Sequence, residues 1–276
     1  HNHTHYRSSA ASDVYKRQLL SCPPVDALYY SHEVSGGTDP DDIWQGLQFY
    51  NDVRGFEDGT RNYRWKAIAT WEYQSPYTPQ YVRYQRRNIP YIVDSVSTCW
   101  MTETIEKVYA ASTQLLSENN IYRNKLHYVS DQTPRLAKRY SLLVEQHSLT
   151  DRAYNYWEKL AAQSANSASL YETQPSSSQG NIYRTDQPGE KVLGCFYATA
   201  IQEKRIFVEW DELDFAAPAF SCRLDTLANN STFLYDIAYY LISLQPLGPG
   251  PPWLGGPDNC FNCKERGGSN EKPDFW

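Results

Sequence analysis

The chain has 276 residues and a formal net charge of -6, and 41% of its residues are hydrophobic while 21% are charged. These proportions are typical of a folded globular protein and exclude a disordered chain. The acidic balance argues against nucleic acid as a partner, because phosphate binding needs a basic stripe and the basic run at 83–87 is short and isolated. No run of about 18 apolar residues is present that would span a membrane.

Aromatic residues are the unusual part of the composition, with 23 Tyr and 8 Trp against a single Met. Tyrosine and tryptophan favour strands, and they also suit half-wetted surfaces where one end of the ring meets water. The composition therefore predicts an extracytoplasmic β-protein, and it is compatible with a face that binds sugar or protein.

Residues 1–18 differ in character from the rest of the chain. Three histidines at the start suggest metal binding, but a Ser/Ala run without apolar periodicity follows them. Residues 12–18 resemble a translated sequencing-adapter scar. We expect 1–18 to be a non-native or disordered leader, and 19–276 to be a single β-rich domain. Because no initiator Met and no signal peptide are visible, we expect a fragment or a processed form.

Three strands are predicted at 25–30, 46–53 and 63–73, and the third has the clearest pattern. Its Tyr, Trp and Ala side chains fall on one face, which indicates a long, half-buried antiparallel strand. We interpret Trp65 and Trp71 as structural anchors in the core and not as a ligand platform. The loop at 36–42 holds three Asp that are either solvated or bind calcium, although an EF-hand glycine and glutamate are missing.

Residues 76–90 are rich in Tyr and Arg and have no regular pattern. Further strands are expected at 92–100, 105–111 and 140–146, with a polar stretch at 117–124. If the protein binds a glycan or peptide ligand, we expect the loops to do so. The candidate ligand-binding residues are Trp44, Tyr77, Tyr81 and Tyr84.

One amphipathic helix is predicted to begin after Thr150, which is a good N-cap residue. Asp151 follows in the first turn, where a negative charge is favourable. Ala153, Trp157 and Leu160 recur at helical spacing and predict a stripe that packs on the sheet, with Trp157 as an anchor.

The second half of the chain predicts strands after a turn at 180–181, at 191–198 and at 204–210. Residues 235–244 are apolar and fit either a short helix or a strand. Pro and Gly punctuate 246–257 and lead to the end of the chain.

The chain ends with two aromatic residues, Phe275 and Trp276, which we expect to be packed on the body as structural anchors. Of the six cysteines, Cys99, Cys222, Cys260 and Cys263 are disulfide candidates, and the sequence does not fix their pairing. We expect at least one of Cys260 and Cys263 to be oxidised. Inert thiols and metal or redox chemistry are the alternatives that the spacing leaves open.

The sequence contains no Gly-x-Ser-x-Gly elbow, phosphate loop or His-Glu-x-x-His helix, which are motifs of common catalytic sites. His147 precedes a serine, and acidic residues gather at 209–214, where a glycosidase would need two carboxylates at a set distance. Nothing in the sequence supports an enzyme, and no catalytic residue, metal or cofactor is predicted.

Several motifs resemble a family of outer-membrane lipoproteins of Bacteroidetes-type bacteria, known as domain of unknown function forty-two forty-nine. The resemblance covers roughly 19–276, and the terminal motif at 260–276 is its most specific part. The other matching segments are 24–30, 62–65 with Trp71, 98–100, 140–144, 153–157, 180–182 and 192–194.

The resemblance implies an immunoglobulin-like β-sandwich with one helix packed on the sheet and long loops. The family has no established catalytic residues. It also implies a lipid-anchored parent protein at the outer membrane, on the cell surface or the periplasmic face, encoded beside a TonB-dependent receptor as partner. Because neither a lipid-bearing cysteine nor a preceding sandwich domain is visible, we expect the C-terminal domain of a longer lipoprotein. Its expected function is non-catalytic capture or uptake of nutrients; an assembly module of an outer-membrane complex and a carbohydrate-active enzyme are the alternatives.

Overall fold

The most regular alternation in the sequence becomes the central strand of the structure, β3 (Asn62–Gln74). Its inward side chains are all buried, from Tyr63 and Trp65 at one end to Trp71 and Tyr73 at the other. Successive side chains of a strand point to opposite faces, so the alternation leaves Arg64 and its outward neighbours on the second face. Strand β3 lies inside a four-stranded antiparallel sheet with the order β6-β3-β8-β9.

The computed structural model describes residues 20–36, 43–85, 87–91, 96–166, 180–182, 186–187, 194–227, 239–243 and 253–276. The remaining elements of the sandwich are β1 (Val25–Gly36), β2 (Ile43–Arg54), β6 (Thr98–Ser112), β7 (Asn120–Ser130), η2 (Pro134–Leu136), β8 (Arg139–Leu149), α2 (Asp151–Asn166), β9 (Ile201–Glu209) and η3 (Trp210–Glu212). The elements beyond it are β4 (Tyr81–Tyr84), β5 (Arg87–Pro90), β10 (Asp225–Leu227), β11 (Tyr239–Ser243), β12 (Trp253–Gly256), η5 (Asp258–Cys260) and η6 (Cys263–Arg266).

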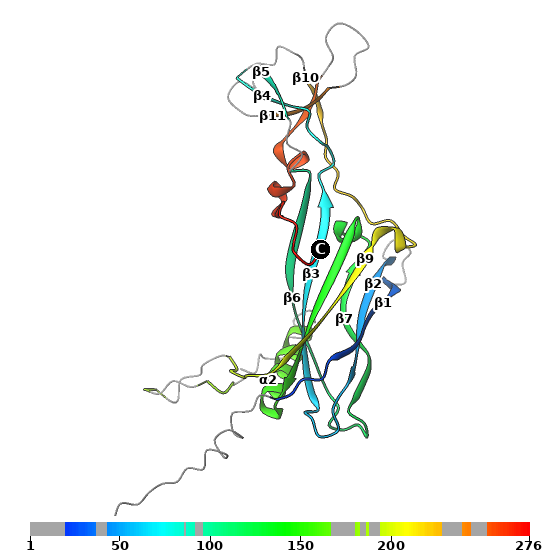
Figure 1. The fold of residues 1–276 in the computed structure, drawn as a ribbon, viewed down its shortest axis with the longest axis vertical. Coiled ribbons are helices and arrows are strands. Elements are labelled where there is room, and N and C mark those ends of the chain that lie inside the picture. The colour runs from blue at the N-terminus through cyan, green and yellow to red at the C-terminus, as the bar shows by residue number, and fades with distance from the viewer. Residues whose placement is uncertain are drawn as a thin grey trace, which may run out of the picture.

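A second antiparallel sheet, β1-β2-β7, packs against the four-stranded sheet and closes a two-layer core (Figure 1). Strand β2 supplies Leu47, Phe49 and Val53 to this core. The rings of Phe49 and Tyr140 on β8 meet across the layers, with centroids 5.6 Å apart. The prediction of a mainly β, sandwich-like fold is therefore confirmed.

Helix α2 packs on the outer face of the four-stranded sheet, chiefly on β6, as the apolar stripe predicted. Thr150 caps it: the backbone N–H of Ala153 donates to Thr150 Oγ1 at 3.3 Å. The guanidinium of Arg64, which points outward from β3, lies 3.8 Å from the ring centre of Trp157. This stacking fixes the helix across the sheet.

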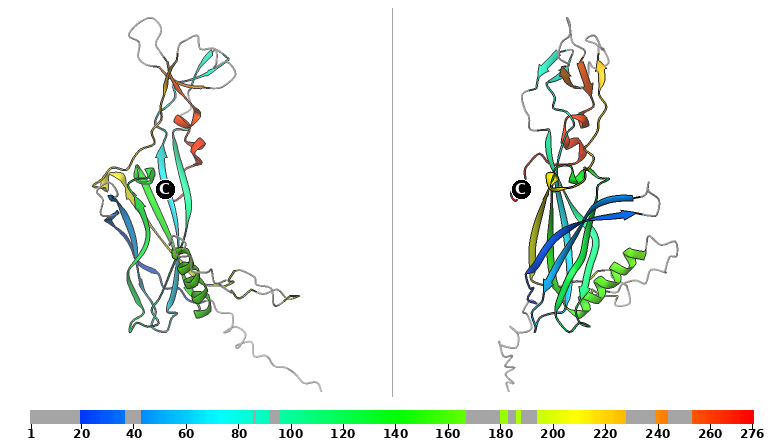
Figure 2. Two further views of the ribbon diagram at one scale, coloured as in Figure 1. Left: turned by 180° about the vertical axis from the view of Figure 1, so that it is seen from behind. Right: turned by 90° about the vertical axis from the view of Figure 1, so that its right-hand side faces the viewer.

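A third sheet lies beyond one end of the sandwich, so that the molecule is elongated (Figure 1 and Figure 2). We call this sheet the head; its strand order is β10-β12-β11-β4-β5 and its described pairs are antiparallel. The head therefore combines a hairpin from the first third of the chain with strands from its last fifth.

Three strand predictions differ from the structure. The expected strands at 92–100 and 105–111 are one edge strand, β6, whose described part begins at Thr98. Strand β7 was not predicted, because the polar stretch at 117–124 contains both the turn that precedes the strand and the first residues of the strand itself. Residues 194–198 form no strand; Tyr197 packs its ring edge-on against Trp157 of helix α2 instead, with centroids 6.2 Å apart, and only the next residue, Thr199, makes an isolated bridge to Leu20.

Several sequence predictions fall outside the described residues. They are the leader at 1–18, the acidic loop at 37–42 with its alternative calcium role, and parts of the expected strands at 92–95, 183–185, 191–193 and 235–238. Within 239–243 the open choice between helix and strand is settled as strand β11.

A half-buried histidine makes the stability of the sandwich depend on pH. Burial, together with the charges of Arg135 and Lys107, lowers the pKa of His127 on β7 from 6.5 to about 4. Between these two pH values the unfolded chain binds a proton that the folded chain does not. Stability is thus fully present above about pH 6.5 and decreases as the pH falls toward 4.

Between about pH 7 and pH 4.5, we expect the free energy of unfolding to fall by roughly 2 kcal/mol less in His127→Gln than in the wild type. This value follows from the difference between the two pKa values at about 1.4 kcal/mol per unit. Urea unfolding at a series of pH values measures this difference. Leu115→Ala, which truncates a fully exposed side chain that does not titrate, is the control and is expected to keep the wild-type profile. Parallel profiles for His127→Gln and the wild type would contradict the expectation.

Candidate functional site

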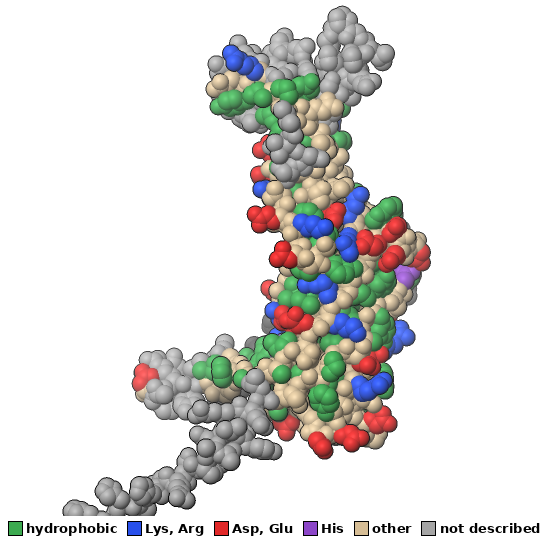
Figure 3. Space-filling model, viewed as in Figure 1, with side chains coloured by type: hydrophobic (Ala, Val, Ile, Leu, Met, Phe, Trp, Pro, Cys, Tyr) green, Lys and Arg blue, Asp and Glu red, His purple; other side chains and the backbone are tan. Residues whose placement is uncertain are grey.

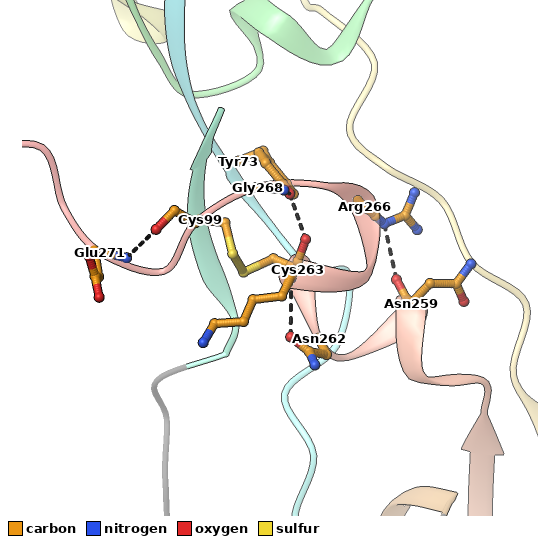
Figure 4. The surroundings of a disulfide bond; sticks show 10 residues. Tyr73, Cys99, Asn259, Asn262, Cys263, Arg266, Gly268 and Glu271 are labelled. Carbon is orange, nitrogen blue, oxygen red and sulfur yellow. Dashed lines mark hydrogen bonds between the residues drawn. A yellow bond between two sulfur atoms is a disulfide. The ribbon is translucent and has the colours of Figure 1, made fainter. Parts of the chain in front are cut away.

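Two disulfides hold the segment between the sandwich and the head, which we call the neck (residues 75–80, 96–97, 213–224 and 257–268). Cys99 at the start of β6 is bonded to Cys263, with Cα atoms 5.7 Å apart, and Cys222 is bonded to Cys260, with Cα atoms 5.5 Å apart. Both cysteines of the terminal pair are thus oxidised, each to a partner distant in sequence. Figure 4 shows the first of these bonds where the end of the chain crosses β6.

A buried tyrosine at the end of β3 fixes the last segment of the chain. The hydroxyl of Tyr73 donates to the carbonyl oxygen of Cys263 at 2.5 Å and accepts from the backbone N–H of Gly268 at 3.1 Å (Figure 4). Burial raises the pKa of Tyr73, so the phenol stays protonated and remains a donor. A Cβ at Gly268 would lie 2.4 Å from that hydroxyl, which requires glycine at this close approach.

The terminal aromatic residues lie on the outer face of the four-stranded sheet. The indole N–H of Trp276 donates to Glu72 Oε2 at 3.1 Å, and its ring packs edge-on against Phe207 with centroids 5.8 Å apart. The guanidinium of Arg205 lies 3.5 Å from the ring centre of Phe275, although 42% of Phe275 is exposed. The end of the chain thus covers the part of this face that α2 leaves open.

The four candidate ligand-binding residues lie at three separate places. Trp44 is 38% exposed on β2 of the sandwich, so it belongs to a strand and not to a loop. Tyr77 is on a loop, but its ring packs on Phe261 and its hydroxyl donates to the carbonyl of Cys222 at 3.3 Å. Tyr81 and Tyr84 both lie on β4 of the head. Only this last pair belongs to one surface element.

The hairpin β4–β5 presents an apolar strip at the edge of the head. Val82 is paired with Ile89 and Tyr84 with Arg87, so these four side chains share one face. Tyr84 is 44% and Ile89 49% exposed. Figure 3 shows hydrophobic side chains gathered over this part of the head, beside a basic one. We call these four residues the head strip.

Ile89 and Val82 were not identified from the sequence. The hairpin has no Gly or Asn at its turn; Gln85 adopts the positive φ of 46° that such a turn needs. The alternation in β4 and β5 spans four residues each, which is too short to distinguish from a loop. Val82 and Ile89 could be assigned to one surface only by pairing β4 with β5, and that pairing can be predicted only once the turn between the two strands is recognised.

Three of the four acidic residues at 209–214 each have a separate partner. Glu209 pairs with Arg139 at 2.7 Å, Glu212 accepts from the hydroxyl of Tyr30, and Asp214 lies 3.1 Å from His32. No group of three or more His, Cys, Asp or Glu that could hold a metal occurs in the described ranges. Within the same ranges no helix is long and apolar enough to cross a membrane.

Among known proteins, this chain is similar to one family model. The chain matches no curated protein and no solved structure. A family model, described as Domain of unknown function (DUF4249), matches residues 8–205, which is more than half of the chain and includes the sandwich strands as far as Arg205 on β9, together with the head hairpin β4–β5. The chain therefore belongs to the DUF4249 family of domains of unknown function.

Proposed function

We propose that this protein is a non-catalytic binding protein, anchored through a lipid on its parent chain at the outer membrane, that works with a TonB-dependent receptor in capturing or taking up a nutrient. The observation that carries the proposal is the head: a sheet held beyond the sandwich by two disulfides, with an apolar strip on its edge hairpin.

The architecture supports a role in holding a partner. The core of the sandwich buries Trp65, Tyr63 and Tyr140, which are each at most 1% exposed, while Trp44 on β2 and Tyr122 on β7 are exposed singly on its surface. The head strip has Tyr84 and Ile89 near half exposure; in the neck below the head, the Cys99–Cys263 disulfide joins the end of the chain to β6 of the sandwich and the Cys222–Cys260 disulfide joins two neck segments. A preorganised surface binds with a lower entropy cost than a flexible one. Large exposed apolar side chains with an adjacent arginine are characteristic of protein contacts.

The receptor as partner follows from the family resemblance described for the sequence, in which members are encoded beside TonB-dependent receptors. The head strip supplies the chemistry for such a contact. Its edge strand β5 pairs only with β4 within the described sheet, and β-strand addition to such an edge is a known mode of peptide recognition. We therefore assign the receptor contact to the head strip.

We expect the double variant Tyr84→Ala/Ile89→Ala to bind the neighbouring receptor at least roughly tenfold more weakly, since central interface residues contribute on the order of 1–2 kcal/mol each. Biolayer interferometry with the purified protein and the detergent-solubilised receptor measures this loss. The matched control is Phe56→Ala, which removes a 47% exposed aromatic side chain in the turn between β2 and β3.

Equal losses in the head variant and in Phe56→Ala would contradict the placement of the contact on the head. Failure of the wild type to bind the receptor would overturn the receptor as partner. If the receptor binds and no glycan binds in an array, the assembly role is favoured over the capture of a nutrient.

A further inference from the structure

A cavity of about 240 Å³ lies where the neck meets the sandwich. One wall is the end of β3 and the residues after it, a second wall follows η2, and the third is the segment that leads to Cys222. Its lining is mainly apolar and consists of Tyr73, Gln74, Ser75, Pro76, Pro134, Ala137, Lys138, Ala219 and Phe220. Gln74 and Ala219 are exposed, so the cavity opens to solvent on their side.

The third wall is fixed by covalent and aromatic contacts. Phe220 packs edge-on against Tyr73, with ring centroids 5.1 Å apart, and the guanidinium of Arg266 covers it at 4.3 Å from the ring centre. The disulfide of Cys222 with Cys260 begins two residues after Phe220. The cavity is therefore bounded by parts of the fold that are held in place, as in a preformed ligand site.

Two polar groups of the lining lack a partner within the described part of the chain. Ser75 is 8% exposed, and its buried Oγ makes no hydrogen bond to any described residue. A buried hydroxyl without a hydrogen bond is costly, so a ligand oxygen that reaches it is favoured. Lys138 is half-buried on the adjacent wall and forms no ion pair with any described residue. Together they provide a positive charge and a hydroxyl beside an apolar enclosure.

The size and the lining restrict the class of ligand. A cavity of about 150 Å³ holds benzene, so this one has room for a ligand of roughly ten non-hydrogen atoms. Stacking of a sugar ring needs an accessible aromatic face, but Tyr73 is 1% exposed and Phe220 is covered by Arg266. An apolar body of this size with one carboxylate fits the lining better than a sugar.

We infer that this neck cavity binds a small carboxylate with an apolar body, whose carboxylate pairs with the ammonium of Lys138 and accepts from the hydroxyl of Ser75. The inference does not rest on the proposed function, because the cavity is separate from the head strip. The carboxylate belongs either to a free acid or to the end of a peptide, since both carry the same group beside an apolar side chain.

Isothermal titration calorimetry with 3-phenylpropionate tests the inference, with 3-phenylpropanamide as the neutral probe of the same shape. We expect saturable binding of the acid and binding of the amide that is roughly tenfold weaker, because a charge-assisted hydrogen bond is stronger than a neutral one. Lys138→Met should reduce the affinity for the acid by a similar factor and leave that for the amide unchanged. Lys264→Met, at an exposed lysine outside the cavity, is the matched control and should bind as the wild type does.

A second variant blocks the cavity and keeps the ammonium group of Lys138. Ala219→Trp fills the opening from an exposed position and should abolish binding of both probes, while circular dichroism and thermal unfolding remain as in the wild type. The tripeptide Gly-Gly-Phe distinguishes the two sources: comparable binding assigns the site to peptide ends, and its absence assigns it to free acids. No saturable binding of either the acid or the peptide would overturn the inference, as would unchanged affinity for the acid in Lys138→Met.

Discussion

Replacing both cysteines of the Cys99–Cys263 disulfide by alanine is expected to lower the free energy of unfolding by about 5 kcal/mol, because the loop that this bond closes is very long. The two cysteines are 164 residues apart in sequence, and both are fully buried. In the chain-entropy description, the bond restricts the unfolded chain, and the restriction increases with the logarithm of the loop length. Guanidinium unfolding of the oxidised wild type and of Cys99→Ala/Cys263→Ala measures the difference.

The second disulfide provides the matched comparison. Cys222 and Cys260 are 38 residues apart, so Cys222→Ala/Cys260→Ala should cost about 4 kcal/mol, less than the first pair. The loss of either bond is a large part of a typical total stability of roughly 5–15 kcal/mol. A smaller loss for the longer loop than for the shorter one would contradict the entropic account.

Trp65→Ala is expected to destabilise the protein by roughly 3–5 kcal/mol, as is usual when a large buried aromatic side chain is removed. Trp65 is 1% exposed at the centre of the sandwich. Its indole N–H donates to Gln146 Oε1 at 2.9 Å, and Gln146 in turn donates to the carbonyl of Pro23 at 2.7 Å. The substitution therefore leaves both a cavity and an unpaired carbonyl oxygen on Gln146.

Chemical unfolding separates these contributions with two further variants. Trp65→Phe keeps most of the volume but removes the indole donor, so it should cost about 1–3 kcal/mol through the unpaired amide. Trp210→Ala removes a tryptophan that is 58% exposed, and it should change stability by no more than about 0.5 kcal/mol. Similar losses in Trp65→Ala and Trp210→Ala would refute the assignment of Trp65 to the core.

The parts of the fold that the sequence predicts well are those with a long local pattern. Strand β3 has thirteen residues with one continuous buried face, so its alternation is visible without any knowledge of its neighbours. The helix is similar, since Thr150 and the stripe through Trp157 define its start and its packing face within a few residues. Both patterns depend only on the geometry of the element itself.

The missed elements are those whose environment is set by distant residues. Strand β7 is an edge of its sheet and exposes Tyr122, Arg123 and Lys125, so its sequence resembles a polar loop. Strand β6 is also an edge, with exposed charged residues in its middle that suggested a break. Edge strands keep charged side chains because these prevent pairing with other chains. The same charged side chains interrupt the alternation of apolar and polar residues by which a strand is recognised in a sequence.

The head and the disulfide pairing could not be derived for the same reason. Strands β4 and β5 are four residues long and find their neighbour β11 only through the tertiary fold. The residues around Cys99 and Cys263 give no sign that they meet, since the contact between them is defined by the return of the chain along β6. The sequence placed the candidates Tyr81 and Tyr84 on a loop, whereas the structure places them on β4 of the head.

The head combines a hairpin from the first third of the sequence with strands from its last fifth, and this has a consequence for biosynthesis. As the polypeptide emerges from the ribosome, the β4–β5 hairpin and Cys99 are made long before β11, β12 and Cys263 exist. During that interval Cys22, Cys195 and Cys222 are thiols with which Cys99 can form a wrong bond, and the apolar hairpin lacks its neighbouring strand β11. Oxidation after synthesis is complete therefore favours the correct product, and an oxidoreductase that delays or reshuffles early bonds should raise the yield of folded protein.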